Sequence, residues 1–385
     1  MLLSIVVPTH NRQKYAKGCI DSLIEIASEE VEVLVSDSST DNELSRYVEL
    51  HYLRNNIRVL KPQNVNNAVE NFNFAIAHAK GHYVLIIGDD DTVLPNIVEL
   101  LQYLKDKSVE AVRFNFPYEY FWDDCYETQK KLNNTVRSTP FTCEVTESSS
   151  IGEAIKVGSN LGHGVLDMPR AYLGVVSRPL IDRINNKYGE LFGGVSPDIY
   201  SSVLISYESA KTVIVDYPVV IPGSSGASTS GKSVNGKHVS ELLDNEHLTA
   251  FPDLVWDKKI PAFYSTHTVW AFSYVQASNV IKNASGFKLD ADFYRLYIKC
   301  FYTYNAYFKY TFESFKFKLA ENYLVGFFKF CRSLIKESCW IFMRIAHRFV
   351  VKKLTILEKV ESLSDCQKII LEDIDNKKVK IIYKV

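Results

Sequence analysis

The chain has 385 residues, of which 46% are hydrophobic and 23% charged, as in a globular protein that buries a sizeable core in one or two domains. Its formal net charge of −1 gives no overall attraction for nucleic acid. Seven scattered cysteines without short spacings indicate a reducing compartment, so we expect a cytoplasmic protein. No run of about 18 apolar residues occurs and the start reads as a strand, so we expect neither a membrane span nor a signal peptide.

Short apolar runs alternate with segments of helical periodicity in the N-terminal part of the chain. Strands are expected at residues 2–8, 31–36, 57–60, 83–87 and 111–116. Helices are expected between them, at residues 14–28, 43–53, 68–79 and 95–105. This order predicts an α/β fold, with a mostly parallel sheet and helices on both faces. In such a fold, ligands bind beyond the carboxyl ends of the strands.

The composition changes along the chain in a way that predicts two regions. Residues 118–150 are polar and irregular, as in an excursion or an antiparallel edge, and residues 223–240 are rich in Gly and Ser, which predicts a mobile loop. Beyond residue 241 the pattern is helical almost to the end, with a short final strand at 379–383. We therefore predict a domain over residues 1–240, with halves at 1–120 and 121–240, and a helical C-terminal region over 241–385.

Three carboxylates, Asp89, Asp90 and Asp91, directly follow the strand expected at residues 83–87. Adjacent carboxylates repel one another, and burial adds to that cost. A divalent cation relieves both, because hard oxygen ligands suit Mg²⁺ or Mn²⁺. Such a cation would bridge a diphosphate and neutralise it as it leaves. The alternative is that these acids cap the next helix and are otherwise solvated.

Two further polar clusters follow the first two expected strands. Asp37 ends the second strand, where an acid can accept hydrogen bonds from a base or a ribose. Pro8, Thr9 and Arg12 belong to a polar turn after the first strand, whose amides and guanidinium can face a nucleotide. A helix cap or a surface turn would give the same patterns.

These clusters together resemble the motifs of the family 2 glycosyltransferases of bacterial surface-polysaccharide synthesis. The sequences are IVVPTHNR at residues 5–12, VLVSDSSTD at 33–41, and AKGHYVL at 79–85 leading into the three acids. Their order and spacing agree with the family, over residues 1–120 and more loosely over 160–225. The resemblance implies a GT-A fold, in which residues 1–120 form the nucleotide-sugar half and residues 121–240 the acceptor half.

The resemblance also implies roles on the donor side. Asp37 would bind the uracil of a UDP-sugar, with Pro8, Thr9 and Arg12 beside the nucleotide.

Among the acids, Asp89 would reach the ribose and Asp90 would bind a divalent cation, Mn²⁺ or Mg²⁺. Asp91 would be a second metal ligand or a contact of the donor sugar. The family motif often reads Asp-x-Asp-Asp, and here Gly88 stands at the position of its first acid.

On the acceptor side, GGVSPDIY at residues 193–200 resembles the second acidic motif of the family. Asp198 would be the general base that takes the proton of the acceptor hydroxyl during inversion. The family usually has Glu-Asp at this point, where this chain has Pro197 and Asp198. The alternative is that Asp198 caps the helix that follows.

Two Gly-rich segments offer further contacts. Residues 158–169 hold His163 and Asp167, which would line the sugar or acceptor pocket, although a histidine in a turn is more often structural. Lys232, Lys237 and His238 lie on the loop at 223–240, which would act as a lid over the diphosphate or as an ordinary linker.

The C-terminal region is basic and aromatic. From residue 288 to residue 353 there are thirteen Lys or Arg against five Asp or Glu, together with many Phe and Tyr. Basic helices with aromatic faces suit an anionic membrane interface, which would bring the site to a lipid-linked acceptor. A helical bundle with an aromatic core is an equal alternative, and nucleic acid a third and weaker one.

The sequence therefore predicts an inverting, metal-dependent glycosyltransferase that moves a sugar from a nucleotide-diphosphate sugar, favoured as a UDP-sugar, to a glycan or lipid-linked acceptor. We expect it in the cytoplasm, peripheral on the inner face of the plasma membrane, without a nucleic acid partner. The alternatives are a non-catalytic nucleotide-sugar binding module and a nucleotidyltransferase. The latter would carry a Gly-rich loop after its first strand, whereas residues 8–12 contain no glycine.

Overall fold

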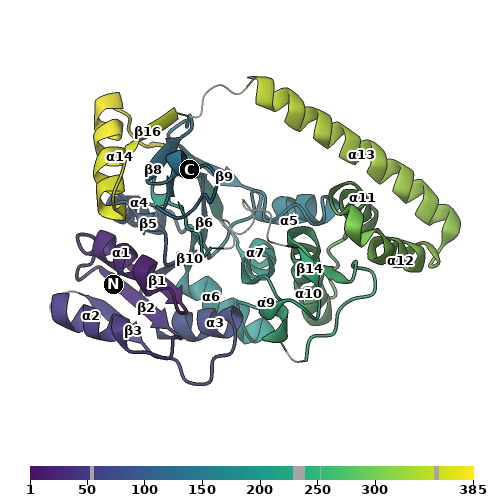
Figure 1. The fold of residues 1–385 in the computed structure, drawn as a ribbon, viewed down its shortest axis with the longest axis horizontal. Helices are drawn as coiled ribbons and strands as arrows, with labels where there is room; N and C mark the ends of the chain where they lie inside the picture. Colours follow the sequence, from purple (N-terminus) through teal and green to yellow (C-terminus); the bar gives the residue numbers. More distant parts are fainter. Residues whose placement is uncertain (53–55, 229–238, 252, 351–354) are drawn as a thin grey trace.

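The computed structural model describes residues 1–52, 56–228, 239–251, 253–350 and 355–385 (Figure 1). Its centre is a nine-stranded sheet in the order β17-β9-β11-β6-β10-β4-β1-β2-β3. The strands are β1 (Leu3–Thr9), β2 (Val31–Asp37), β3 (Ile57–Leu60), β4 (Tyr83–Ile86), β6 (Ala111–Phe114), β9 (Glu144–Ser148), β10 (Gly174–Ser177), β11 (Thr212–Val215) and β17 (Ile382–Lys384).

Most of these strands run in one direction. β3, β2, β1 and β4 are parallel neighbours, β6 and β11 pair in parallel, and β10 lies antiparallel between β4 and β6. β9 is antiparallel to β11, and β17 is parallel to β9. The predicted α/β fold with a mostly parallel sheet is confirmed.

Helices cover both faces because the strand side chains alternate between them. Val33 and Val35 of β2 face one core, which also contains residues of α1 (Gln13–Leu23), α2 (Glu43–His51), α4 (Ile97–Asp106) and α14 (Leu363–Lys377). Leu34 faces the second core, which contains residues of α3 (Ala68–His78), α5 (Ser150–Ser159), α6 (Arg178–Tyr188) and α7 (Pro197–Glu208).

The second core continues into the helical part of the chain. α10 (Thr266–Ser285) packs on α7, and α11 (Phe293–Thr303) packs on α10. α12 (Phe308–Leu319) and the long α13 (Tyr323–Val350) follow, and Figure 1 shows α13 as an outer helix along one side of the molecule. α9 (Glu246–Thr249) and the short pair β14 (Ser240–Glu241) and β15 (Phe263–Tyr264) precede α10.

Small strands join segments that lie far apart in the sequence. β7 (Tyr118–Phe121) pairs with β8 (Thr135–Ser138), as expected of an antiparallel excursion, and β13 (Gly223–Ser224) pairs with β7. β5 (Thr92–Val93) pairs with β12 (Val220–Ile221). These pairings bring the segment at 220–224 beside the segment that follows β4.

The last residues differ from the helical expectation. β16 (Thr355–Lys359) is a strand paired with β8, because β-branched residues such as Thr355 and Ile356 meet an open strand edge there. α14 then packs on α1, and the expected final strand is β17. The end of the chain thus lies against the N-terminal half, and the division into domains at residue 240 stays a prediction.

Candidate functional site

The carboxyl ends of β1, β2 and β4 meet at one edge of the sheet. Thr9, the last residue of β1, is the register partner of Asp37, the last residue of β2. β4 pairs with the other side of β1 and leads directly into Gly88 and the three acids. Pro8 is buried within β1, so it contributes to the wall of this edge and offers no polar side-chain atom.

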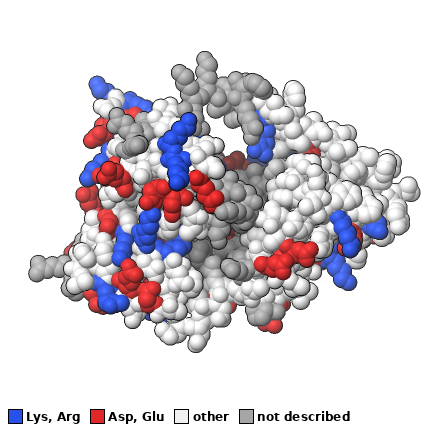
Figure 2. Space-filling view, in the orientation of Figure 1, with Lys and Arg blue, Asp and Glu red and all other residues white. Residues whose placement is uncertain are grey.

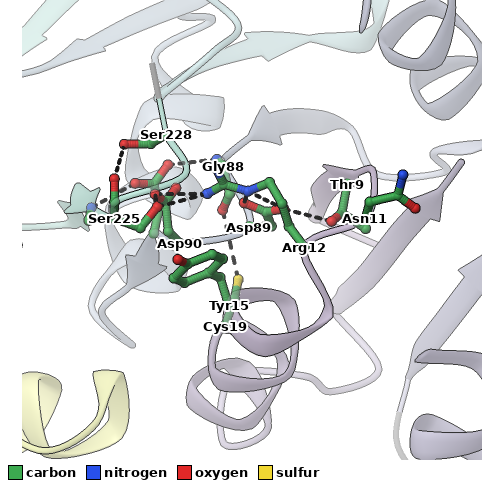
Figure 3. A network of polar contacts seen from close by, with 12 residues as sticks. Thr9, Asn11, Arg12, Tyr15, Cys19, Gly88, Asp89, Asp90, Ser225 and Ser228 are labelled. Carbon is green, nitrogen blue, oxygen red and sulfur yellow. Dashed lines mark hydrogen bonds and ion pairs between the residues drawn. The ribbon is translucent and has the colours of Figure 1, made fainter. Parts of the chain in front are cut away.

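Arg12 connects the first turn to the acids (Figure 3). Its Nε donates to Asp89 Oδ1 at 2.8 Å, and its Nη2 lies 3.0 Å from Asp90 Oδ2. Thr9 Oγ1 donates to Asp89 Oδ2 at 2.6 Å. Tyr15 holds the guanidinium from below, with Arg12 Cζ 4.8 Å from the ring centroid. The predicted residues Thr9, Arg12, Asp89 and Asp90 therefore form one buried network.

Residues 223–225, which follow β12, complete this network from a distant part of the sequence. Ser225 Oγ donates to Asp90 Oδ2 at 2.5 Å and accepts from Arg12 at 3.0 Å. Gly223 N donates to Asp91 Oδ1 at 2.7 Å. A Cβ on Gly223 would lie 1.8 Å from the Asp90 carbonyl oxygen, so only glycine allows this approach.

Sequence reasoning assigned the whole of 223–240 to a mobile loop and missed Ser225. The start of this segment is instead fixed, since Gly226 N donates to Asp124 Oδ1 at 3.1 Å and the Tyr15 hydroxyl donates to the other Asp124 oxygen. The Gly and Ser composition that suggested mobility also suits close contact with acids. Lys232, Lys237 and His238 lie outside the described residues, and their role in a lid stays a prediction.

The three acids are buried, and the positive charge beside them is smaller than their combined negative charge. Burial raises the pKa of Asp89 to about 6, even though Arg12 acts to lower it. The pKa of Asp91 is raised well above its usual value by burial and by the charge of Asp90. Asp89 and Asp90 thus share one guanidinium, Asp91 has no ion pair with a described residue, and a further positive charge would stabilise the ionised forms of all three.

Asp91 differs from its neighbours in its contacts. One carboxylate oxygen accepts from Gly223 N, and the other accepts from Gly88 N at 2.6 Å. Both oxygens therefore hold the backbone of the two facing segments. Asp90 Oδ1, in contrast, accepts no hydrogen bond from any described residue, so Asp90 is the acid best placed to take an external ligand.

Gly88 explains the departure from the family motif. A Cβ there would lie 2.8 Å from Asp91 Oδ2, 2.9 Å from Asp90 Oδ1 and 2.9 Å from the Tyr172 hydroxyl. An acid at this position would therefore need the other two acids and the tyrosine to move. Tyr172 reaches the site from the segment before β10, beside the end of β4, and sequence reasoning did not find it.

Asp37 is fully buried at the end of β2. One oxygen accepts from Ser39 N at 3.0 Å, and the other accepts from Lys61 Nζ at 3.1 Å. Lys61 also donates to the carbonyl oxygens of Ser39 and Asp41, so it ties the turn after β2 to the segment after β3. Sequence reasoning missed Lys61, whose signal was only its place just past an expected strand.

Asp198 lies in the first turn of α7. Its Oδ1 accepts from the Ser196 hydroxyl and from Ile199 N at 2.9 Å, which is a capping arrangement. The charge of Asp198 nevertheless acts on both Tyr172 and Arg170. The charges of all three acids also act on Tyr172, and its hydroxyl lies 2.9 Å from the position of a Cβ on Gly88, so this tyrosine lies beside the acids and within range of the charge of Asp198.

His163 and Asp167 have separate surroundings. His163 Nε2 lies 3.5 Å from Glu337 Oε1 and its ring lies 5.0 Å from that of Trp340, both on α13, and 6.1 Å from that of His267 on α10. Burial lowers the pKa of His163. Asp167 pairs with Arg113 at 3.0 Å. Their predicted acceptor contacts stay predictions.

The oxygen ligands at this edge of the sheet provide only part of what a divalent cation needs. Within the described ranges, no group of three or more His, Cys, Asp or Glu is arranged to hold a metal ion. Asp90 offers an oxygen, and the network lacks positive charge, but a cation would need further oxygen ligands, such as those of a diphosphate. The residues therefore fit a cation that arrives with, or is shared by, a phosphorylated ligand.

The comparison with known proteins matches the part of the chain that forms this edge of the sheet. Residues 4–139 match the family model described as glycosyl transferase family 2. Glycosyltransferase GlyG of Streptococcus pneumoniae is 35% identical over 121 residues, or 31% of this chain and 40% of that protein. Chondroitin synthase of Pasteurella multocida is 33% identical over 114 residues, or 29% of this chain and 12% of that protein. The matched segment thus spans less than half of either relative.

One solved structure, at low sequence identity, aligns with part of this chain. Residues 1–349 of S. aureus TarS in complex with UDP-GlcNAc give a TM-score of 0.47 at 16% identity, covering 77% of this chain and 70% of that one.

The edge of the sheet that gathers the acids around Arg12 thus lies within residues 4–139, the part of the chain that is similar to glycosyl transferase family 2.

Proposed function

We propose that the protein transfers a sugar from a nucleotide-diphosphate sugar, with a UDP-sugar favoured, to a glycan or lipid-linked acceptor in the synthesis of a surface polysaccharide such as O-antigen or capsule. The observation that carries the proposal is the network of Arg12, Asp89 and Asp90, closed by Ser225 at the carboxyl edge of the sheet. Buried carboxylates with a deficit of positive charge suit a cation-bound diphosphate.

The residues of this network divide the work of holding the donor. Asp37, fixed by Lys61, is the proposed acceptor of hydrogen bonds from the base, with Thr9 beside it in register. Asp90 is the proposed ligand of Mn²⁺ or Mg²⁺, and Asp89 with Arg12 faces the ribose and the phosphates. A bound cation supplies charge neutralisation of the leaving diphosphate. Asp91 has both oxygens engaged, so we assign it to holding the site rather than the metal.

Asp198 is the proposed general base for transfer with inversion. Release from the Ser196 hydroxyl would free its carboxylate to take the proton of the acceptor hydroxyl. We expect Asp198→Asn to reduce transfer at least about 100-fold, since general bases contribute factors of about 10² to 10⁴, while UDP affinity stays unchanged. Transfer assays and UDP titration of the same preparations test this, and undiminished transfer would show that Asp198 is not the base.

Two other functions make different products. A nucleotidyltransferase would release pyrophosphate, whereas a glycosyltransferase releases a nucleoside diphosphate. A non-catalytic binding module would bind the donor and release neither. Product analysis after incubation with UDP-, GDP- and dTDP-sugars therefore separates the three. Turnover of a GDP-sugar alone would overturn the proposed role of Asp37 in binding uracil.

We propose that α13 and its surroundings lie on an anionic membrane surface. Leu324, Phe328, Ile335 and Phe342 are all exposed, with Phe328 71% and Phe342 72% accessible. In an ideal helix these positions fall within about 40° of one another, opposite the buried Glu337. Figure 2 shows the surface over α13 as largely uncharged on the face drawn. An exposed apolar stripe of this length is unusual unless something covers it.

The charges of α13 favour lipid as the occupant. Lys329, Arg332, Lys336 and Arg344 are its cationic residues in the part with described side chains, where its one acid, Glu337, is buried. Cationic residues flanking an apolar stripe suit an interfacial helix on anionic lipid. Among the described residues, no helix combines the length and apolar character needed to span a bilayer.

Flotation with liposomes tests this placement. The double variant Phe328→Glu with Ile335→Glu should lose binding to vesicles of phosphatidylcholine and phosphatidylglycerol, while Leu50→Glu, an equally exposed site on α2, should float like the wild type. Equal flotation of all three proteins would contradict the membrane role. Self-association of the wild type in size-exclusion chromatography, abolished by the double variant, would assign the stripe to a second copy of the chain instead.

A further inference from the structure

The segment before β10 carries an arginine into the site. The backbone at residues 171–173 is fixed to the end of β4, since Ile86 N donates to Ala171 O at 3.1 Å and Leu173 N donates to Ile86 O at 2.7 Å. Leu173 has a φ of +54°, a left-handed conformation that is uncommon for a leucine and often marks functional segments. Arg170 therefore stands at the carboxyl edge of the sheet, two residues from Tyr172.

The guanidinium of Arg170 has no polar partner in the described chain. Its Nε atom is buried without a hydrogen bond, and its Cζ lies 4.9 Å from the centroid of the Phe116 ring. Burial, together with the neighbouring charge of Arg113, lowers the pKa of Arg170 to about 10. Arg170 as a whole is partly exposed, but a buried guanidinium nitrogen usually has an acceptor, so this one is under-compensated.

The nearby acids are already engaged. Asp167 pairs with Arg113, whose Nε also donates to Leu166 O at 3.2 Å. Asp198 accepts from Ser196 and Ile199 N. Asp167 thus serves Arg113, and Asp198 is held by the start of its own helix, so neither acid forms an ion pair with Arg170 among the described residues.

We propose that Arg170 binds an anionic group, a carboxylate or a phosphate, on the acceptor. This inference rests on the proposed function, because Asp198 marks the acceptor side of the site there. The donor side already has its own arginine, Arg12, which pairs with Asp89 and Asp90. The fork of Arg170 matches the two oxygens of a carboxylate or phosphate, and Phe116 fixes the plane of that fork.

Binding of small anionic probes tests the assignment. We would titrate methyl glucuronide and glycerol 3-phosphate, and their neutral counterparts methyl glucoside and glycerol, into the full chain with UDP and Mn²⁺ present, observed by saturation-transfer NMR. The wild type should prefer at least one anionic probe by about tenfold, in line with charge-assisted bidentate pairing. The two anionic probes separate a carboxylate from a phosphate.

Variants then locate the preference. Arg170→Gln should abolish it and Arg170→Lys should weaken it, while UDP affinity stays within about twofold of the wild type. Arg46→Gln, an exposed arginine on α2, removes the same charge and should change nothing. Arg170→Gln should also keep or raise the Tm, because it removes a buried charge without a partner.

Other results would overturn the inference. An anionic preference that survives in Arg170→Gln, or its absence from the wild type, contradicts the site while UDP binding leaves the proposed function intact. A tenfold loss of UDP affinity in Arg170→Gln assigns the arginine to the donor diphosphate instead. A fall in Tm of more than about 5 °C with unchanged probe binding assigns it to the fold. If UDP fails to bind, the proposed function falls separately.

Discussion

Two buried charge clusters in this molecule have opposite balances. At the sheet edge, Asp89 and Asp90 share Arg12, Asp91 lies next to them without an ion pair to a described residue, and burial raises the pKa of Asp89 to about 6. Between α11 and α13, Glu337 pairs with Arg295 at 2.7 Å and lies 3.8 Å from Lys299. There burial acts to raise the pKa of Glu337, but the charge of Lys299 and the hydrogen bonds from Arg295 and Tyr302 lower it to about 2.

The difference separates a site from a structural cluster. The helical cluster supplies its own countercharge and closes on itself, and Lys299 Nζ donates to Asn160 Oδ1 and to Leu161 O. The acid cluster is short of positive charge and has an oxygen of Asp90 without a described partner. A buried deficit costs stability unless a ligand supplies the missing charge. We therefore predict that neutralising an acid at the sheet edge keeps or raises the stability of the fold, whereas removing Glu337 from the helical cluster lowers it.

The largest expected effect is the loss of transfer in Asp90→Asn. Without the proposed cation ligand, the rate should fall about 1,000-fold, comparable to the loss of a major electrostatic group. The free energy of unfolding should stay the same or rise by about 1 kcal/mol, since one of three repelling carboxylates is removed. Transfer assays and urea denaturation measure the two quantities. Asp182→Asn, at an exposed site on α6, is the control. A marked loss of stability in Asp90→Asn but not in the control would contradict the view that the acid cluster is short of positive charge.

Glu337→Ala should give the opposite stability result. It leaves the buried Arg295 and Lys299 without their carboxylate, and breaking a buried pair in this way costs about 3 kcal/mol or more. The free energy of unfolding from urea titration checks this. Glu313→Ala, at an exposed position on α12, should cost less than about 0.5 kcal/mol. If the two variants are equally stable, the helical cluster is not the structural element inferred here.

The smallest expected effect is a dependence of stability on pH, which arises in the helical part of the molecule. Burial and the charge of Lys299 lower the pKa of His267 to about 4. The unfolded chain, with a histidine pKa of about 6.5, therefore binds more protons than the folded chain between these values. Stability is lost as the pH falls from about 6.5 towards 4, by up to about 2 kcal/mol between pH 7 and pH 5.

Urea titrations at several pH values measure this slope. His267→Gln should flatten it, whereas His51→Gln, an exposed histidine on α2, should keep it. His163 also faces this cluster and its pKa is lowered by burial, so a residual slope is expected in His267→Gln. An unchanged slope in that variant would contradict the assignment to His267.

The N-terminal half could be predicted because its signals are local. The apolar runs at residues 31–36 and 83–87 became β2 and β4, and parallel neighbours necessarily bring Asp37 and the three acids to one edge. The network around Arg12 follows from that topology together with the family resemblance.

Contacts between distant segments gave no such signal. Ser225 meets Asp90 across 135 positions, and Lys61 reaches Asp37 from the next strand. Composition could mark residues 223–228 only as Gly- and Ser-rich, although part of that segment is fixed. β16 was expected to be helical, because its strand pairing depends on the edge of β8, more than 200 residues earlier in the chain.

The most direct test of the account is a calorimetric titration of UDP into the full chain, with Mn²⁺ and with EDTA. The deficit of positive charge around Asp90 predicts binding at least about tenfold tighter with Mn²⁺, and no such gain in Asp90→Asn. GDP and dTDP titrated in parallel should bind more weakly. Equal affinity for UDP with and without the cation, or no UDP binding at all, would contradict the claim that this acid edge holds a cation-bound nucleotide sugar.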